Sequence, residues 1–198
     1  MTSRKLIVGL TGSFGSGKST VAGMFRRCGA RKVIDCDRLA HEVFKPAHPI
    51  GKKIRPLLGL KGKLERKSIA KIVFSNPKTR RQLEALVHPY VLGRVLGELK
   101  KISSGVVILE VPLLFESGFD RLCDATVAVS ASRRAVIKRL RSRGFKPGEV
   151  YGRLRTQLPD LEKKKRADFH IQNSGSYAEL LNRVKWVWQK LKCNNQNG

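Results

Sequence analysis

The sequence predicts an α/β protein in which helices cover both faces of a parallel β-sheet. Three observations support this prediction. Short apolar runs recur along the 198 residues, segments with helical periodicity separate them, and a glycine-rich turn follows the first run. Apolar strands that alternate with helices are typical of a parallel sheet that is buried on both sides.

Five strands are expected, and each has the composition of a buried strand. They cover residues 5–10, 31–34, 106–110, 125–130 and 169–172. Helices are expected between and after them, at 18–28, 38–44, 67–74, 78–87, 90–102, 132–143, 147–158, 161–166 and 177–191. A proline disfavours helical geometry in the residue before it, so His88-Pro89 should interrupt the long helical segment. No element is predicted for the stretch rich in Pro, Gly and Lys that runs to about residue 63.

The composition indicates a globular, soluble, cytoplasmic protein. Hydrophobic residues make up 41% of the chain, and no run approaches the ~20 apolar residues of a membrane span. The four cysteines, Cys28, Cys36, Cys123 and Cys193, form no C-x-x-C pair. We expect them to be free and mostly buried thiols.

The net charge is unusual, because 41 basic residues against 15 acidic ones give +26. Such a surface could bind polyanions, or it could be a solvated face around a pocket for small anionic substrates. The basic residues are spread along the chain, with no RNA-recognition signature or helix-turn-helix spacing. Charge alone is therefore weak support for a function in nucleic-acid binding.

The glycine-rich turn fits the pattern G-x-x-x-x-G-K-[ST] as Gly12, Gly17, Lys18 and Ser19. The glycines allow a tight turn whose N–H groups point at phosphate oxygens, and the next helix presents its positive end. Lys18 can reach the β- and γ-phosphates, and the Ser19 hydroxyl can ligate Mg²⁺. The loop therefore predicts binding of a nucleoside triphosphate and Mg²⁺.

Carboxylates follow two of the predicted strands. Asp35 and Asp37 come at the end of the second strand, where residues two apart would face the same side. The ligand crevice of an open α/β sheet lies beyond the carboxyl ends of its strands, so an aspartate there could take a proton from an attacking hydroxyl. Asp37 could instead cap the helix that begins at Arg38. Glu110 ends the third strand and could hold a water bound to Mg²⁺.

Together these pieces resemble the dephospho-CoA kinase family. The matching stretches run in the family's order from about residue 6 to 176. They comprise the loop from Gly9 to Thr20, Val33-Ile34-Asp35-Cys36-Asp37 with His41, Leu86-Val87-His88-Pro89, Pro112-Leu113-Leu114-Phe115-Glu116, and Gln157, Glu162-Lys163, Ala167-Asp168 and Ile171 to Gly175. Many kinases share such a loop, but the other elements in this order are much more specific.

The resemblance implies a P-loop NTPase core with a five-stranded parallel sheet flanked by helices, a helical substrate-binding insertion and a lid. The core would comprise residues 1–62, 103–142 and 167–198, the CoA-binding insertion 63–102, and the lid 143–166. The implied reaction transfers the γ-phosphate of ATP to the 3′-hydroxyl of dephospho-CoA. The implied partners are these two small molecules, with no specific nucleic acid and no membrane, and the chain would be a monomer or weak oligomer.

The resemblance also implies roles for individual residues. The catalytic residues would be Asp37 as base, Lys18, and Arg139 from the lid. Other residues would bind ATP: Gly12, Ser13, Phe14, Gly15, Ser16, Gly17, Lys18, Ser19, Thr20, Arg139, Arg143, Asn173 and Gly175. The acceptor side would comprise Thr11, Asp35, Asp37, His88, Pro112, Leu113, Leu114 and Glu116. Ser19, and Glu110 through water, would hold the metal.

Two other functions stay open from the residues. The chain could be another small-molecule kinase on the same fold, with a nucleoside or a nucleotide as its acceptor. An assay with a panel of acceptors would distinguish such a kinase from a dephospho-CoA kinase. It could also be a basic, nucleotide-regulated protein that binds nucleic acid. In that case, binding to DNA or RNA would be salt-dependent and tight, with no phosphorylation of an acceptor.

Overall fold

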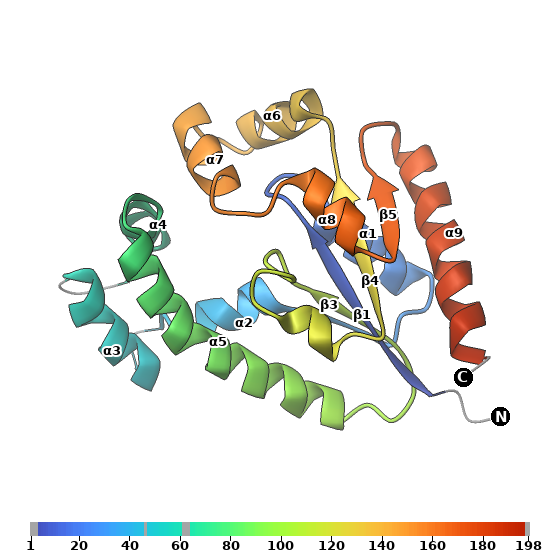
Figure 1. Ribbon diagram of the computed structural model, residues 1–198, viewed down its shortest axis with the longest axis horizontal. Helices are drawn as coiled ribbons and strands as arrows, with labels where there is room; N and C mark the ends of the chain where they lie inside the picture. The colour runs from blue at the N-terminus through green and yellow to red at the C-terminus, as the bar shows by residue number, and fades with distance from the viewer. Residues whose placement is uncertain (1–3, 46, 61–63, 197–198) are drawn as a thin grey trace. The chain divides into compact units, whose positions relative to one another are not determined.

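The computed structural model describes residues 4–45, 47–60 and 64–196 (Figure 1). Its contacts divide the chain into two compact units. The core unit comprises the described residues of Met1–Asp35 and Ile102–Gly198, and the helical unit those of Cys36–Lys101.

The core unit is built on the predicted five-stranded parallel sheet. Its strands are β1 (Lys5–Gly12), β2 (Lys32–Asp35), β3 (Gly105–Glu110), β4 (Ala125–Ser130) and β5 (Phe169–Gln172). They lie in the order β2-β3-β1-β4-β5, and every pairing is parallel. The central strand β1 therefore has β3 on one side and β4 on the other, and all five carboxyl ends meet at one edge.

Helices cover both faces of this sheet, as the apolar strands predict (Figure 1). On one face α1 (Lys18–Arg27) and α9 (Tyr177–Gln196) pack with the alternate β1 residues Leu6, Val8 and Leu10 in a single buried cluster. On the other face α8 (Asp160–Arg166) contacts β1 and β4. Because side chains alternate along a strand, β1 supplies apolar groups to one layer and leaves Gly9 and Thr11 for the other.

Two short helices lie beyond the carboxyl end of β4. These are α6 (Arg133–Arg141) and α7 (Pro147–Leu154), and they share a small buried cluster of Val136, Leu140 and Val150. Phe14 of the glycine-rich turn packs against the same cluster. The α7 helix ends four residues earlier than expected, at Leu154. The turn η1 (Phe119–Leu122) precedes β4.

The helical unit consists of α2 (Cys36–Glu42), α3 (Pro49–Leu58), α4 (Arg66–Ser75) and α5 (Pro77–Lys100). The first three all pack against α5. For this reason the unit begins at Cys36 rather than at residue 63, where the insertion was expected.

The α3 helix lies in a stretch for which the sequence predicts no element. Its start is defined by His48, whose side chain accepts a hydrogen bond from the Ile50 N–H at 3.3 Å, and by Pro49 in the first turn. Proline is favoured there because its missing N–H has no helical partner in any case. Ile54 and Leu58 are buried, so packing outweighs a composition that suggests a loop.

The predicted interruption at His88-Pro89 is wrong, because α5 runs through it. Five residues spaced four apart are buried on one side of the helix: Leu83, Val87, Val91, Val95 and Leu99. Their burial supplies more free energy than the ~3 kcal/mol that an interior proline costs. Asn76 caps the start by accepting bonds from the N–H groups of Lys78 and Thr79.

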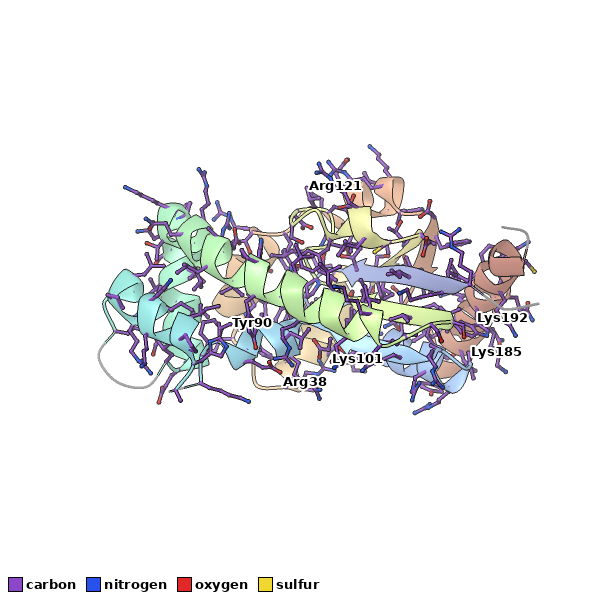
Figure 2. All side chains as sticks on the ribbon, turned by 90° about the horizontal axis from the view of Figure 1, so that it is seen from below. Arg38, Tyr90, Lys101, Arg121, Lys185 and Lys192 are labelled. Atoms are coloured by element: carbon purple, nitrogen blue, oxygen red, sulfur yellow. The ribbon has the colours of Figure 1, made fainter. Side chains whose placement is uncertain are left out.

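Many of the basic residues that outnumber the acidic ones lie at the surface. Figure 2 shows basic side chains projecting from many elements, among them Lys185 and Lys192 of α9 and Lys101 after α5. All four cysteines are free, as expected, but only Cys36 is buried. Burial raises the pKa of the half-buried Cys123 thiol to about 12. Among the described residues, no helix has the length and apolar character needed to span a membrane.

Replacing Pro89 with alanine should stabilise the helical unit. The exposed Pro89 lies inside α5 and has no N–H to donate to the preceding turn. We expect the free energy of unfolding to rise by about 1–3 kcal/mol, measured by urea denaturation with helix content followed by circular dichroism. A lower stability would mean that α5 needs the local bend that proline produces in order to pack.

Candidate active site

The glycine-rich turn joins the end of β1 to the start of α1, and its shape requires glycine at two places. A Cβ on Gly12 would lie 2.1 Å from the carbonyl oxygen of Val129 in β4, so only glycine fits there. Gly17, the residue before α1, has a φ of +95°, in the left-handed region. A Cβ on Gly17 would also lie 2.2 Å from the side-chain nitrogen of Asn173. The turn is therefore held tightly between β4 and the end of β5.

Lys18 folds back into this turn. Its buried ammonium donates to the carbonyl oxygens of Gly12 at 2.7 Å and Ser13 at 3.3 Å. The positive charge therefore lies among backbone dipoles at the start of a helix, where a phosphate group is favoured.

Oxygen groups gather beside the turn at the carboxyl edge of the sheet. The Ser19 hydroxyl donates to Glu110 Oε1 at 2.6 Å, and Glu110 is buried at the end of β3. Asp35, the last residue of β2, is paired in register with Glu110. The Thr11 hydroxyl donates to the carbonyl oxygen of Pro112 at 3.1 Å, which ties β1 to the segment after β3. The edge thus offers hydroxyl and carboxylate oxygens next to a phosphate-binding turn.

Arg139 and Asn173 close the other side of the turn. Both donate to the carbonyl oxygen of Ser16, Arg139 at 3.3 Å and Asn173 at 2.8 Å. Arg139 also donates to the backbone and side-chain oxygens of Asn173, at 2.9 and 3.0 Å. Residues from α6 and from the end of β5 therefore meet on the turn.

A cavity of about 250 Å³ lies beside the same turn within the core unit. Residues of α6, α7 and α8 line it together with Ser13, and its wall is mainly apolar. Arg133, Tyr151 and Asp160 supply polar groups at its margin. The cavity is thus bounded by α6, α7 and the start of α8, and Ser13 of the phosphate-binding turn contributes to its wall.

Comparison with known proteins agrees with this geometry. A profile of the dephospho-CoA kinase family matches residues 6–179, which is most of the chain. The chain belongs to this family. It is 37% identical to the dephospho-CoA kinase of Thermus thermophilus over 194 residues, covering 98% of this chain and 95% of that protein.

Solved structures of similar proteins have the same fold. A Thermus thermophilus protein has a TM-score of 0.82 at 38% identity, covering 95% of this chain and 98% of that one. The dephospho-CoA kinase from Campylobacter jejuni has a TM-score of 0.68 at 29% identity, covering 96% and 99%. The P-loop fold that the family resemblance implies is thereby confirmed.

Two acceptor-side residues that the dephospho-CoA kinase motifs predict lie in the helical unit. Asp37 is the second residue of α2, and His88 lies within α5. The expectation that strand alternation places Asp35 and Asp37 on one side is wrong, because β2 ends at Asp35 and the helix begins at Cys36. Asp37 is therefore also not the residue that caps this helix. Its exposed carboxylate lies in the first turn, where the helix dipole favours negative charge.

Three other residues predicted to bind ATP are Phe14, Arg143 and Gly175, and none of their side chains or exposed positions forms part of the contacts around Lys18 described above. Phe14 points its ring at α6 and α7, 5.1 Å from the Phe145 ring and 4.5 Å from the Arg153 guanidinium. Only its backbone belongs to the phosphate-binding turn. Arg143 is exposed beyond the end of α6, just before Gly144, whose φ of +79° suits a helix end. Gly175 is exposed after β5.

Three further residues, to which the sequence analysis gave no role, hold the turn or the segment after β3. Gln157 accepts a hydrogen bond from the Phe14 N–H at 3.0 Å, and Asp160 accepts one from the Ser13 hydroxyl. Lys163 in α8 donates to the Pro112 carbonyl oxygen at 2.7 Å. Lys163 begins a run of four basic residues that looks like a solvated surface. Only its inclusion among the family's matching stretches singled it out.

Replacing Asn173 with alanine should weaken ATP binding. The change removes the bond to the Ser16 carbonyl and one acceptor of Arg139, so the turn loses two of its supports. We expect the Kd for ATP, measured by isothermal titration calorimetry, to rise about tenfold or more. Asn76→Ala is a matched control, because it also removes two side-chain hydrogen bonds but lies in the helical unit. Equal ATP affinity in both variants would contradict a role for Asn173 in shaping the turn.

Proposed function

We propose that this chain transfers the γ-phosphate of ATP to the 3′-hydroxyl of dephospho-CoA, yielding coenzyme A and ADP. The observation that carries the proposal is the set of oxygen groups beside the phosphate-binding turn. Ser19, Glu110 and Asp35 stand at one sheet edge, next to a buried lysine, in a chain of the dephospho-CoA kinase family. Such an edge suits phosphoryl transfer, which depends on positioning and charge neutralisation.

The nucleotide would be held by the turn and its supports. The backbone N–H groups of residues 12–20 would face the phosphates, and the Lys18 ammonium would exchange its bonds to loop carbonyls for the β- and γ-phosphate oxygens. Arg139 would neutralise charge on the transferring group, with Arg143 as a second cation from the lid. Asn173 and Gly175 would lie against the adenine.

The residues present suit Mg²⁺. The ion prefers oxygen ligands and keeps several waters, and the hydroxyl of Ser19 and the carboxylate of Glu110 are such donors. Among the described residues, no three His, Cys, Asp or Glu side chains gather as a metal site, which agrees with an ion held largely by substrate phosphates. Ser19 would bind the ion directly and Glu110 through water. When bound, Mg²⁺ would neutralise charge on the β- and γ-phosphate oxygens.

The acceptor would be bound and activated from the other side. Asp37 would accept a hydrogen bond from the 3′-hydroxyl and take its proton as the new P–O bond forms, and Asp35 would support this site. Thr11, His88 and the segment after β3 would contact the acceptor, the last through Pro112, Leu113, Leu114 and Glu116. The insertion 63–102, most of which belongs to the helical unit, would hold the remainder of dephospho-CoA. The lid, 143–166, would exclude water so that ATP is not hydrolysed.

In this proposal the protein works in the cytoplasm as a monomer or weak oligomer, with ATP and dephospho-CoA as its partners. Its basic surface would attract both substrates, which carry several negative charges. No specific nucleic acid is required.

The test is a phosphorylation assay with ATP, Mg²⁺ and dephospho-CoA, in which coenzyme A is detected by mass. Adenosine and AMP serve as control acceptors. We expect coenzyme A from the wild type and a loss of several orders of magnitude with Lys18→Ala, because the lysine contacts the transferring group. Phosphorylation of adenosine or AMP in its place would indicate a nucleoside or nucleotide kinase. ATP binding without any phosphorylation would favour the nucleic-acid alternative.

Replacing Asp37 with asparagine should reduce turnover while leaving ATP affinity unchanged. The substitution keeps size and polarity but removes the group that takes the proton. We expect kcat to fall on the order of 10²- to 10⁴-fold. ATP affinity is measured separately by calorimetry, and Asp120→Asn, at the turn before β4, is the control for an unrelated aspartate. Near-normal turnover of Asp37→Asn would remove Asp37 from the role of base.

A further inference from the structure

Lys163 is a buried cation within a basic helix. Its side chain is 1% exposed, whereas Lys165 on the same helix is 63% exposed. Its ammonium donates to the Pro112 carbonyl oxygen at 2.7 Å and lies 3.3 Å from Glu116 Oε1. Burial lowers the pKa of Lys163, and the carboxylates of Glu116 and Asp160 oppose that effect. Burying an ammonium group costs free energy, so an apolar side chain at position 163 would be buried at a lower cost.

The two groups that Lys163 contacts are the ends of one short segment, the acceptor segment Pro112–Glu116. At its first residue, the Pro112 carbonyl accepts from both Lys163 and the Thr11 hydroxyl of β1. At its last residue, Glu116 Oε1 accepts from the Leu158 N–H at 2.8 Å as well as facing Lys163. Contacts thus hold the acceptor segment at both ends, and Lys163 contributes one contact at each end.

Residues just before Lys163 contact the phosphate-binding turn. Gln157 accepts from the Phe14 N–H, and Asp160 accepts from the Ser13 hydroxyl. Residues 157–163 therefore contact both the turn, through Gln157 and Asp160, and the acceptor segment, through Leu158 and Lys163. A single short stretch of chain sets the separation of the two.

We infer that Lys163 is a positioning residue, which fixes the acceptor segment relative to the phosphate-binding turn. This inference rests on the proposed function, because it takes residues 112–116 to contact the phosphate acceptor. Phosphoryl transfer requires attacking and leaving oxygens in line, and a small displacement of one substrate is costly. Lys163 touches neither substrate and acts through the Pro112 carbonyl and Glu116.

The test is Lys163→Met, which keeps the length and apolar stem of the side chain but removes the ammonium. We expect the KM for dephospho-CoA to rise at least about tenfold, since the Pro112 carbonyl and Glu116 lose their shared partner. The KM for ATP should stay within about twofold, because the contacts of Gln157 and Asp160 with the turn remain. Lys165→Met, at an exposed position of α8, is the matched control and should change neither KM.

A second variant keeps the inference testable if Lys163→Met does not fold. Glu116→Gln retains oxygen and shape but removes the charge that faces Lys163. It should raise the KM for dephospho-CoA by a smaller factor than Lys163→Met, again without changing the KM for ATP.

A purely structural role would lower kcat with the folded fraction and leave both KM values unchanged, and that result would overturn the inference. An equal rise in both KM values, or an unchanged KM for dephospho-CoA in Glu116→Gln, would overturn it too. Failure of the proposed function is distinct, because the wild type itself would then form no coenzyme A.

Discussion

The parallel pairing of β1 between β3 and β4 is the constraint on which the site depends. In a parallel sheet all strands end at the same edge, so the segments that follow them lie close together even when they are distant in sequence. The turn after β1, Glu110 at the end of β3 and Asp35 at the end of β2 come together in this way. The close approach of Gly12 to the Val129 carbonyl then fixes the turn against β4. A side chain at Gly12 would force β1 and β4 apart at the point where the phosphates are to be bound.

The charged groups buried at the site of this basic chain have hydrogen-bonding or charged partners. With 15 acidic residues among 198, few carboxylates are available, and several of them lie at the site. Glu110 accepts from the Ser19 hydroxyl, and Glu116 faces the ammonium of Lys163. A buried charge without such a partner would cost several kcal/mol, so each pair keeps a charged group in place at a tolerable cost. Most of the other described basic residues are exposed, so water solvates their charges.

The sequence predicted the sheet well, because each strand is a short apolar run between clear turns. A motif with fixed spacing predicted the glycine-rich turn with Lys18 and Ser19, and the end of an apolar strand singled out Glu110. Arg139 and Asn173 came from the family resemblance, and the structure places both against the turn. The sequence-based prediction failed where tertiary packing outweighs local preference. The α3 helix forms in a stretch rich in glycine and proline, and α5 continues through Pro89, because both bury apolar residues in the helical unit. No role was predicted for Lys163, because it stands in a run of four basic residues of which the other three are exposed, and burial of one of them depends on what packs against α8.

The position of Asp37 follows from chain geometry rather than from strand alternation. Consecutive Cα atoms are about 3.8 Å apart, so the Cα of Asp37 lies no more than about 7 Å from that of Asp35. Asp35 belongs to the core sheet and is paired with Glu110, whereas Asp37 belongs to α2 of the helical unit. The proposed base therefore follows Asp35 with one residue between them, and Asp35 is paired with the proposed metal-side carboxylate Glu110. A base at the first turn beyond the sheet thus stays close in sequence to the strand that ends at the phosphate-binding edge.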